Sequence, residues 1–275
     1  MKLIVQADDY AMTDGVAEGI LHAARYGILT QTGLMTNGPH AEYYAKRMES
    51  ECPHVSLGMD VNLVSGRPLS DPKTIPTLVD ENGYLIKSGV HKRRDKEGDP
   101  NHISYEDAYT EIEAQVLKFF EITGHKPYYI IGHSYDCENT NKARANVIEK
   151  YGLTTFEYLI KAAQIPEPGF DPWWTYSAKE NLMEAQWNAI DPLDMFKNNQ
   201  LGYFQDHVNE KDAICFLHTH AGFVDDALLK MSSLTITRVR EENMLCDPYV
   251  VNWVKQHDVE LIGSRELAKI IDEKR

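Results

Sequence analysis

Cysteine is scarce in this chain of 275 residues, and long apolar runs are missing altogether. The four cysteines are Cys52, Cys137, Cys215 and Cys246. None forms a Cys-x-x-Cys pair, so their spacing indicates neither a zinc ribbon nor a redox dithiol, and we expect free thiols in a reducing compartment. Asp8 and Asp9 interrupt the apolar N-terminus at once, and no stretch reaches the length of a transmembrane helix. We therefore expect a cytoplasmic protein with no membrane partner.

Basic residues are also few. Lys and Arg number 28 against 42 Asp and Glu, which gives a formal net charge of −14 at neutral pH. Such a balance argues against nucleic acid as the main partner, because nucleic acid rewards Lys and Arg. Hydrophobic residues make up 43% of the chain, which excludes a disordered protein. An excess of carboxylates makes a local cation site plausible.

Strand-like runs alternate with helical segments along most of the chain. Strands are expected at 3–5, 28–35, 55–63, 127–131, 213–217 and 259–262, with a further extended run at 153–158. Helices are expected at 14–26, 41–48, 105–121, 142–151, 248–257 and from 264 onward. Two excursions rich in loop residues cover 65–102 and 165–176. This order predicts an α/β fold with a mainly parallel sheet, organised as a modified, TIM-barrel-like (β/α) barrel with inserted loop excursions and formed by one domain over 1–275.

Polar residues follow several of the expected strands at the point where each strand ends. They are Asp8, Asp9, Asp60, His133 and His220. In a (β/α) barrel this rim holds the active site, so these side chains are expected to converge. Asp9, Asp60 and His133 form a candidate metal site, and Asp8 could take a proton from water bound there. Each residue also has a plain structural interpretation, as a helix cap, a solvated acid or a loop histidine.

Two further groups carry candidate roles. His218 and His220 are two residues apart on an expected strand and so share one face, where His220 could donate a proton to a leaving group. One of these histidines could instead pack in the barrel while the other caps a turn. Arg238 and Arg240 lie in a charged run that is commonly a solvated face.

An aromatic pair completes the candidates. Trp173 and Trp174 lie in the second excursion, where they could stack on sugar rings or form core or lid contacts.

Taken in order, several segments resemble the YdjC family of metal-dependent carbohydrate deacetylases, the chitooligosaccharide deacetylase-like group. They are LIVQADDY at 3–10, the following helix and strand at 15–35, LGMDVNL at 57–63 with GRPL at 66–69, the strand from 126 to His133, HAGFVD at 220–225, and the RVRE run at 238–241. The ordered set covers nearly the whole chain.

The resemblance implies a modified (β/α) barrel, often dimeric, with a divalent metal ion. By position, Asp9 and His133 match two of the family's metal ligands, and Asp60 stands where the family has a histidine. Asp8 matches the family's base and His220 its acid. Because Asp-Asp-His is richer in oxygen than Asp-His-His, Mg²⁺ is favoured, with Mn²⁺ or Zn²⁺ as alternatives.

The sequence therefore predicts a metal-dependent hydrolase that removes an acetyl group from a small N-acetylated sugar. Arg238 or Arg240 would order Asp8 or bind the substrate. Two alternatives stay open: a non-catalytic metal- or carbohydrate-binding barrel, and an amidohydrolase acting on a non-sugar acetylated substrate. They are motivated by departures from the family pattern, where Tyr135 and Cys137 replace two histidines and Ile131 and Gly132 replace Asp-Ser.

Overall fold

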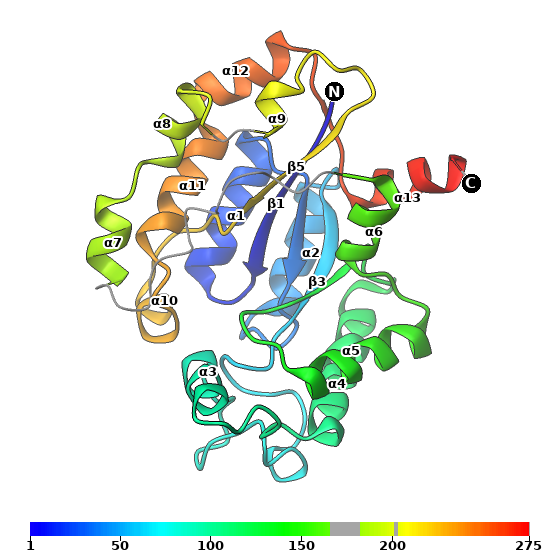
Figure 1. Cartoon of the computed structure of the whole chain (residues 1–275), viewed down its shortest axis with the longest axis vertical. Coiled ribbons are helices and arrows are strands. Elements are labelled where there is room, and N and C mark those ends of the chain that lie inside the picture. The colour runs from blue at the N-terminus through cyan, green and yellow to red at the C-terminus, as the bar shows by residue number, and fades with distance from the viewer. Residues whose placement is uncertain (166–181, 201–202, 275) are drawn as a thin grey trace.

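A parallel β-sheet forms the centre of the molecule (Figure 1). The structure is a computed structural model that describes residues 1–165, 182–200 and 203–274. Its strands are β1 (Lys2–Tyr10), β2 (Gln31–Leu34), β3 (Ser56–Val61), β4 (Ile130–Gly132), β5 (Ile214–Thr219) and β6 (Glu260–Leu261). They lie in the order β4-β3-β2-β1-β5, with β6 beside the start of β1, and every pair of these strands is parallel. The predicted α/β fold with a parallel sheet is confirmed.

The start of α6 lies between the two edges of this sheet, β4 and β5. Ile130 of β4 forms a parallel bridge with Thr155, and the next residue, Phe156, packs its ring 4.9 Å from that of Phe216 on β5. Among the described strands, no ladder of hydrogen bonds joins β4 to β5. A closed barrel therefore stays a prediction.

Helices surround the sheet in the order that alternation predicts (Figure 1). Their bounds are α1 (Asp14–Tyr26), α2 (Ala41–Glu51), η1 (Pro72–Thr74), α3 (Ser88–Lys96), α4 (Tyr105–Thr123), α5 (Glu138–Tyr151), α6 (Phe156–Ala163), α7 (Leu182–Asn188), α8 (Pro192–Lys197), α9 (Tyr203–Asp206), α10 (Asp226–Met231), α11 (Ile236–Cys246), α12 (Pro248–Gln256) and α13 (Ser264–Glu273). The Ser104 hydroxyl caps α4 by accepting from the Asp107 amide at 3.1 Å, and Gly152 ends α5 in the left-handed region. Within the described part of the chain, the helices are all too short or too polar to cross a membrane.

Several segments differ from the prediction, and the helices α7, α8, α9, α10 and α11 were not predicted. The run 153–158 is not a strand, because Thr155 caps a helix by accepting from the Tyr158 amide at 3.0 Å, and Phe156 and Leu159 then bury one face of α6. The excursion 65–102 contains the helix α3, which the charge-rich sequence did not predict. The same excursion also contains a small hairpin, marked by an antiparallel bridge between Val79 and Leu85.

The loop after β5 packs directly against α1. A β-carbon added to Gly19 would lie 2.4 Å from the Phe223 amide nitrogen, so only glycine allows the helix and loop to approach this closely. This contact fixes the residues that follow β5 against the helix that follows β1. β1 and β5 both carry polar residues at their carboxyl ends, and this packing helps to hold the two groups of polar residues in place relative to each other.

Candidate active site

Asp8 and Asp9 lie in the last residues of β1, which extends beyond the predicted run 3–5 to Tyr10. The pairing of β1 with β2 shifts register between Ala7 and Tyr10, and Asp9 has a φ of 72°, in the left-handed region. Such irregularities re-aim side chains at strand ends near functional sites. Adjacent strand residues normally point to opposite faces, and here both carboxylates reach polar partners at the same rim.

The predicted metal residues are brought together by three strands. Asp9 from β1, Asp60 from β3 and His133, directly after β4, offer ligand atoms that all lie within 4.8 Å of one another. His133 Nδ1 is 2.7 Å from Asp9 Oδ1, and the Asp9 amide donates to Asp60 Oδ2 at 3.2 Å. Asp60 Oδ1 is buried and has no hydrogen-bond partner among the described residues. A buried carboxylate oxygen left in this way fits a cation ligand.

The surroundings of Asp9 and Asp60 shift the pKa values of their carboxyl groups in opposite directions. Burial opposes ionisation of Asp9, but the charges of His133 and Arg238 outweigh it and hold the pKa of Asp9 well below its usual range. Asp60 has the opposite balance, since burial and the negative charges of Asp8 and Asp9 raise its pKa well above the usual value. A cation beside Asp60 would relieve this repulsion and favour its ionised form.

Arg238, on α11, is only 1% exposed and supplies the cationic partner of Asp9. Its guanidinium donates to Asp9 Oδ2, to the carbonyl of Leu234 at 3.0 Å and to the carbonyl of His220 at 3.3 Å. The sequence prediction placed Arg238 or Arg240 beside Asp8 or the substrate, and the structure gives Arg238 the neighbouring Asp9. This buried ion pair links α11 to the end of β1.

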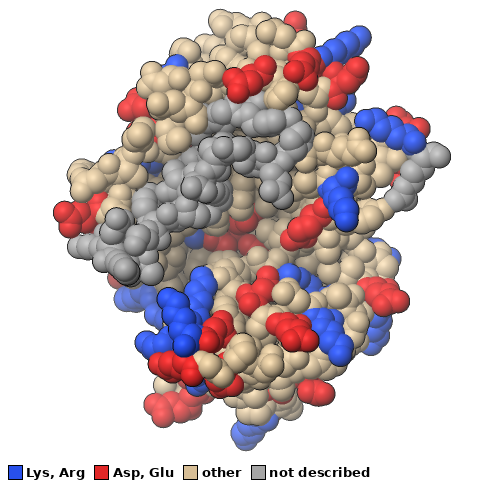
Figure 2. Space-filling view, in the orientation of Figure 1, with Lys and Arg blue, Asp and Glu red and all other residues tan. Residues whose placement is uncertain are grey.

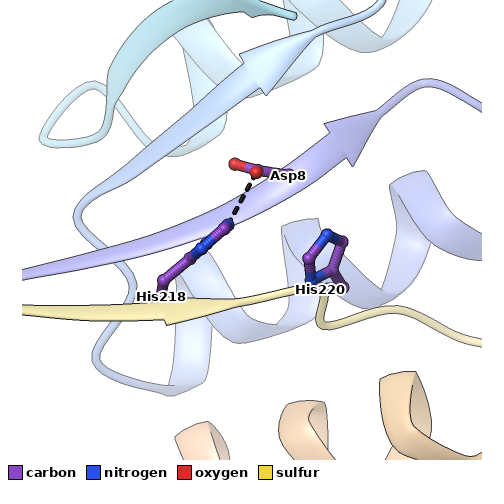
Figure 3. A group of neighbouring side chains, drawn as sticks. All are labelled: Asp8, His218 and His220. Carbon is purple, nitrogen blue, oxygen red and sulfur yellow. Dashed lines mark hydrogen bonds and ion pairs between the residues drawn. The ribbon is translucent and has the colours of Figure 1, made fainter. Parts of the chain in front are cut away.

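Asp8 has its own partners (Figure 3). His218 Nε2, on β5, lies 2.6 Å from Asp8 Oδ2, and Gln6 Nε2 donates to Asp8 Oδ1 at 2.6 Å. Burial opposes ionisation of Asp8, yet His218 lowers its pKa below the usual value. In turn, burial lowers and Asp8 raises the pKa of His218, and the net effect is upward. Asp8 is therefore held as a carboxylate, and it favours the protonated form of the His218 imidazole.

Beneath this pair, Gln31 Nε2 donates to Gln6 Oε1 at 2.5 Å, and the Ser264 hydroxyl donates to Gln31 Oε1 at 2.6 Å. This buried chain of amides runs from Asp8 across β2 to the start of α13. Sequence reasoning did not select Gln6 and Gln31. The available signal was the period of two along β1, which puts Gln6 on the same face as Asp8.

His220 directly follows β5 and reaches toward the same rim (Figure 3). Its amide donates to Glu241 Oε2 of α11 at 2.5 Å. Burial lowers the pKa of the His220 imidazole to about 4, so this ring is neutral at neutral pH. Asp8, His218 and His220 also offer ligand atoms within 4.8 Å of one another, which makes them a second group able to hold a cation.

A cavity of about 800 Å³ opens beside these residues. Its wall includes Asp9, His133, His220 and Arg238. Lysines also line it: Lys87, Lys92 and Lys230. Figure 2 shows this hollow, with acidic side chains at its floor and basic side chains at its lower edge. The volume suits a small-molecule ligand of one or a few sugar units.

The remaining predicted residues either contact a part of the structure other than the metal group or lie outside the described residues. Arg240 donates to the carbonyls of Gln186 at 3.0 Å and Ala189 at 3.1 Å, where it holds the end of α7, and its role toward a substrate stays a prediction. Trp173 and Trp174 lie outside the described residues.

Comparison with known proteins gives one consistent family. The family model described as YdjC-like protein matches residues 2–256. A carbohydrate deacetylase of Thermoanaerobacter pseudethanolicus is 27% identical over 94% of this chain and 95% of its own, and one of Geobacillus stearothermophilus is 29% identical over 97% and 98%. A crystal structure from Enterococcus faecalis, of a protein named for cellobiose-phosphate cleavage, superposes with a TM-score of 0.70 at 21% identity, over 97% of this chain and 98% of that one.

Proposed function

Because the chain belongs to the YdjC-like protein family, we propose that it is a metal-dependent carbohydrate deacetylase, a hydrolase of the amide bond in N-acetylated sugars. One observation carries the proposal. Asp9, Asp60 and His133, from three separate strands, present ligand atoms within 4.8 Å of one another beside a cavity large enough for a sugar. Relatives named carbohydrate deacetylase match this chain over nearly their whole length, which supports the choice of substrate class.

Asp9, Asp60 and His133 would hold the cation. Two of the three donors are carboxylates, so Mg²⁺ is favoured, and Mn²⁺ or Zn²⁺ also suits a set that includes an imidazole. When bound, such an ion polarises the acetamide carbonyl and lowers the pKa of a water molecule. Arg238 balances the charge of Asp9 and fixes its Oδ2, which leaves Asp9 Oδ1 beside His133.

Asp8 accepts a proton from the attacking water in this proposal. It is ionised because His218 lies 2.6 Å away, and Gln6 holds its other oxygen in place. A carboxylate with a lowered pKa is a weak base, so Asp8 acts once the pKa of the water has itself been lowered.

His220 protonates the departing amine. Its ring lines the cavity, and the contact of its amide with Glu241 fixes its position at the end of β5. Because its pKa is about 4, the ring starts neutral, and the proton that Asp8 takes from the attacking water has to reach His220 before the ring can deliver it to the amine. A ring that holds a proton weakly passes it readily to an amine, which is the stronger base.

Acetate release tests the proposal. The substrates are N-acetylglucosamine and its short oligomers, assayed with chelator and after addition of Mg²⁺, Mn²⁺ or Zn²⁺. We expect chelation to abolish turnover and a divalent ion to restore it, while Asp9→Asn and His133→Ala lower kcat/KM at least about 100-fold. His257→Ala, at an exposed histidine after α12, is the matched control and should leave activity unchanged. Turnover that survives chelation and both site substitutions contradicts the metal mechanism.

A further inference from the structure

A third group of side chains able to hold a cation lies outside the cavity, where α1 packs against α11. It consists of His22 on α1 with Glu242 and Cys246 on α11. None of the three lines the cavity described above. The two residues of α11 are four positions apart, so they lie on one face of the helix, one turn from each other. His22 faces them from the neighbouring helix.

Their functional atoms converge on one point. His22 Nδ1 lies 2.5 Å from Glu242 Oε1, and the Cys246 thiol donates to the same oxygen at 3.1 Å. Cys246 Sγ lies 3.5 Å from His22 Nδ1, and all three ligand atoms fall within 4.8 Å of one another. The His22 ring packs 4.8 Å from Tyr26 and 5.8 Å from Phe223, which limits its rotation. The donors are thus already held close to the positions that binding one ion requires.

We propose that His22, Glu242 and Cys246 form a second metal site, selective for Zn²⁺ and similar transition-metal ions. Imidazole and thiolate are donors that Zn²⁺ and Co²⁺ accept and Mg²⁺ does not, which separates this site from the oxygen-rich group around Asp9. On binding, the Cys246 proton passes to solvent and the ion takes its place between sulfur and carboxylate. Water completes the fourth position.

Access and position support this assignment. The His22 side chain is 43% exposed and that of Glu242 only 8%, so an ion can enter from solvent and still be held against a buried carboxylate. α11 also carries Arg238 and Glu241, the residues that hold Asp9 and His220. An ion here joins this helix to α1, and we expect it to raise the melting temperature. The site does not depend on the proposed deacetylase function.

Titration of the full-length protein with Co²⁺, under a phosphine reductant, tests the proposal. A Co²⁺–thiolate bond gives a charge-transfer absorption band in the near ultraviolet, and Asp9, Asp60 and His133 contain no sulfur, so they cannot produce it. We expect the band in the wild type and its loss in Cys246→Ser. His22→Gln should weaken Co²⁺ affinity at least tenfold. Added Zn²⁺ should displace Co²⁺ and abolish the band.

Cys137→Ser is the matched control, because Cys137 is also a half-buried thiol and serine caps a helix equally well. This variant should keep the full band. A wild type without the band overturns the proposal, as does a band that persists in Cys246→Ser or one that His22→Gln leaves at full affinity. Loss of deacetylase activity in Asp9→Asn has no bearing on the result, so the two proposals fail separately.

Discussion

At the scale of single residues, the site is governed by buried charge. Asp9 is ionised because His133 and Arg238 flank it, whereas Asp60, 1% exposed, has only an amide donor and two negative neighbours. The pKa is therefore lowered for Asp9 and raised for Asp60, although the two residues are neighbours. That asymmetry explains how a cation-free site can stay folded and still attract a divalent ion.

Arg238→Met tests the charge balance. The substitution leaves the Asp9 carboxylate buried without its guanidinium, and we expect the free energy of unfolding to fall by about 3–5 kcal/mol. Arg240→Met, two residues away and partly exposed, removes hydrogen bonds to carbonyls and a partly exposed ion pair with Asp191 at 3.5 Å, and should cost about 1 kcal/mol. Urea denaturation of both variants measures the difference. Equal losses would show that the ion pair of Asp9 and Arg238 contributes little.

Asp60 gives a prediction about pH. Its pKa is raised, so in the cation-free protein it binds a proton at pH values where an ordinary aspartate is ionised. The cation must displace that proton, hence affinity falls as pH falls and binding releases a proton. Calorimetry of Mn²⁺ binding, repeated in buffers of different ionisation enthalpy, measures both quantities.

Asp60→Asn is the control for this titration, because the amide cannot ionise. Binding to the variant should be weaker and less dependent on pH. If wild type and Asp60→Asn show parallel slopes of affinity against pH, the proton does not come from Asp60.

The sequence predicted the carboxylates and histidines of the rim because strand ends can be read from apolar runs. It did not predict Gln6, Gln31 or Glu241, since the period of two along β1 places Gln6 on the face of Asp8 but does not show which buried amide or acid contacts a site residue. Arg238 was selected, but its partner depends on how α11 crosses the end of β1, which is a tertiary contact.

At the scale of elements, glycine decides where helices and loops meet. Gly19→Ala would place a methyl group 2.4 Å from the Phe223 amide and push the loop after β5 away from α1. We expect a loss of about 1–3 kcal/mol in stability, with reduced turnover because His220 moves with the loop. Thermal unfolding and acetate release are the two measurements.

Gly89→Ala serves as the control, because Gly89 is also helical and an added β-carbon meets nothing within 4 Å. That change should be neutral or stabilising by up to about 1 kcal/mol. A Gly19→Ala variant as stable as Gly89→Ala would show that the approach of loop and helix is not tight.

Elements with strong local signals were predicted well. The helices α1 and α4 have side-chain caps and periodic apolar faces, whereas α5 begins four residues before its predicted start at 142. The prediction of an extended run at 153–158 was wrong, because its apolar residues suit strand and helix alike. The cap at Thr155 decides in favour of the helix. α3 was missed because its exposed, charged sequence has almost no apolar face.

At the scale of the whole molecule, parallel strands bring distant parts of the chain to one edge. Asp9, Asp60, His133 and His220 are spread over more than 200 residues, and only the strand order β4-β3-β2-β1-β5 places them side by side. The parallel sheet was predictable from alternation. Barrel closure and the expected homodimer stay predictions, because both depend on contacts that alternation does not encode.

Anomalous scattering from crystals grown with Mn²⁺ tests the central claim most directly. The account predicts an anomalous peak for one Mn²⁺ ion at the wall of the cavity, bound by carboxylate oxygens of Asp9 and Asp60 and by a ring nitrogen of His133. The peak should be lost in the Asp9→Asn variant. Strong scattering elsewhere with none between these three side chains would contradict it.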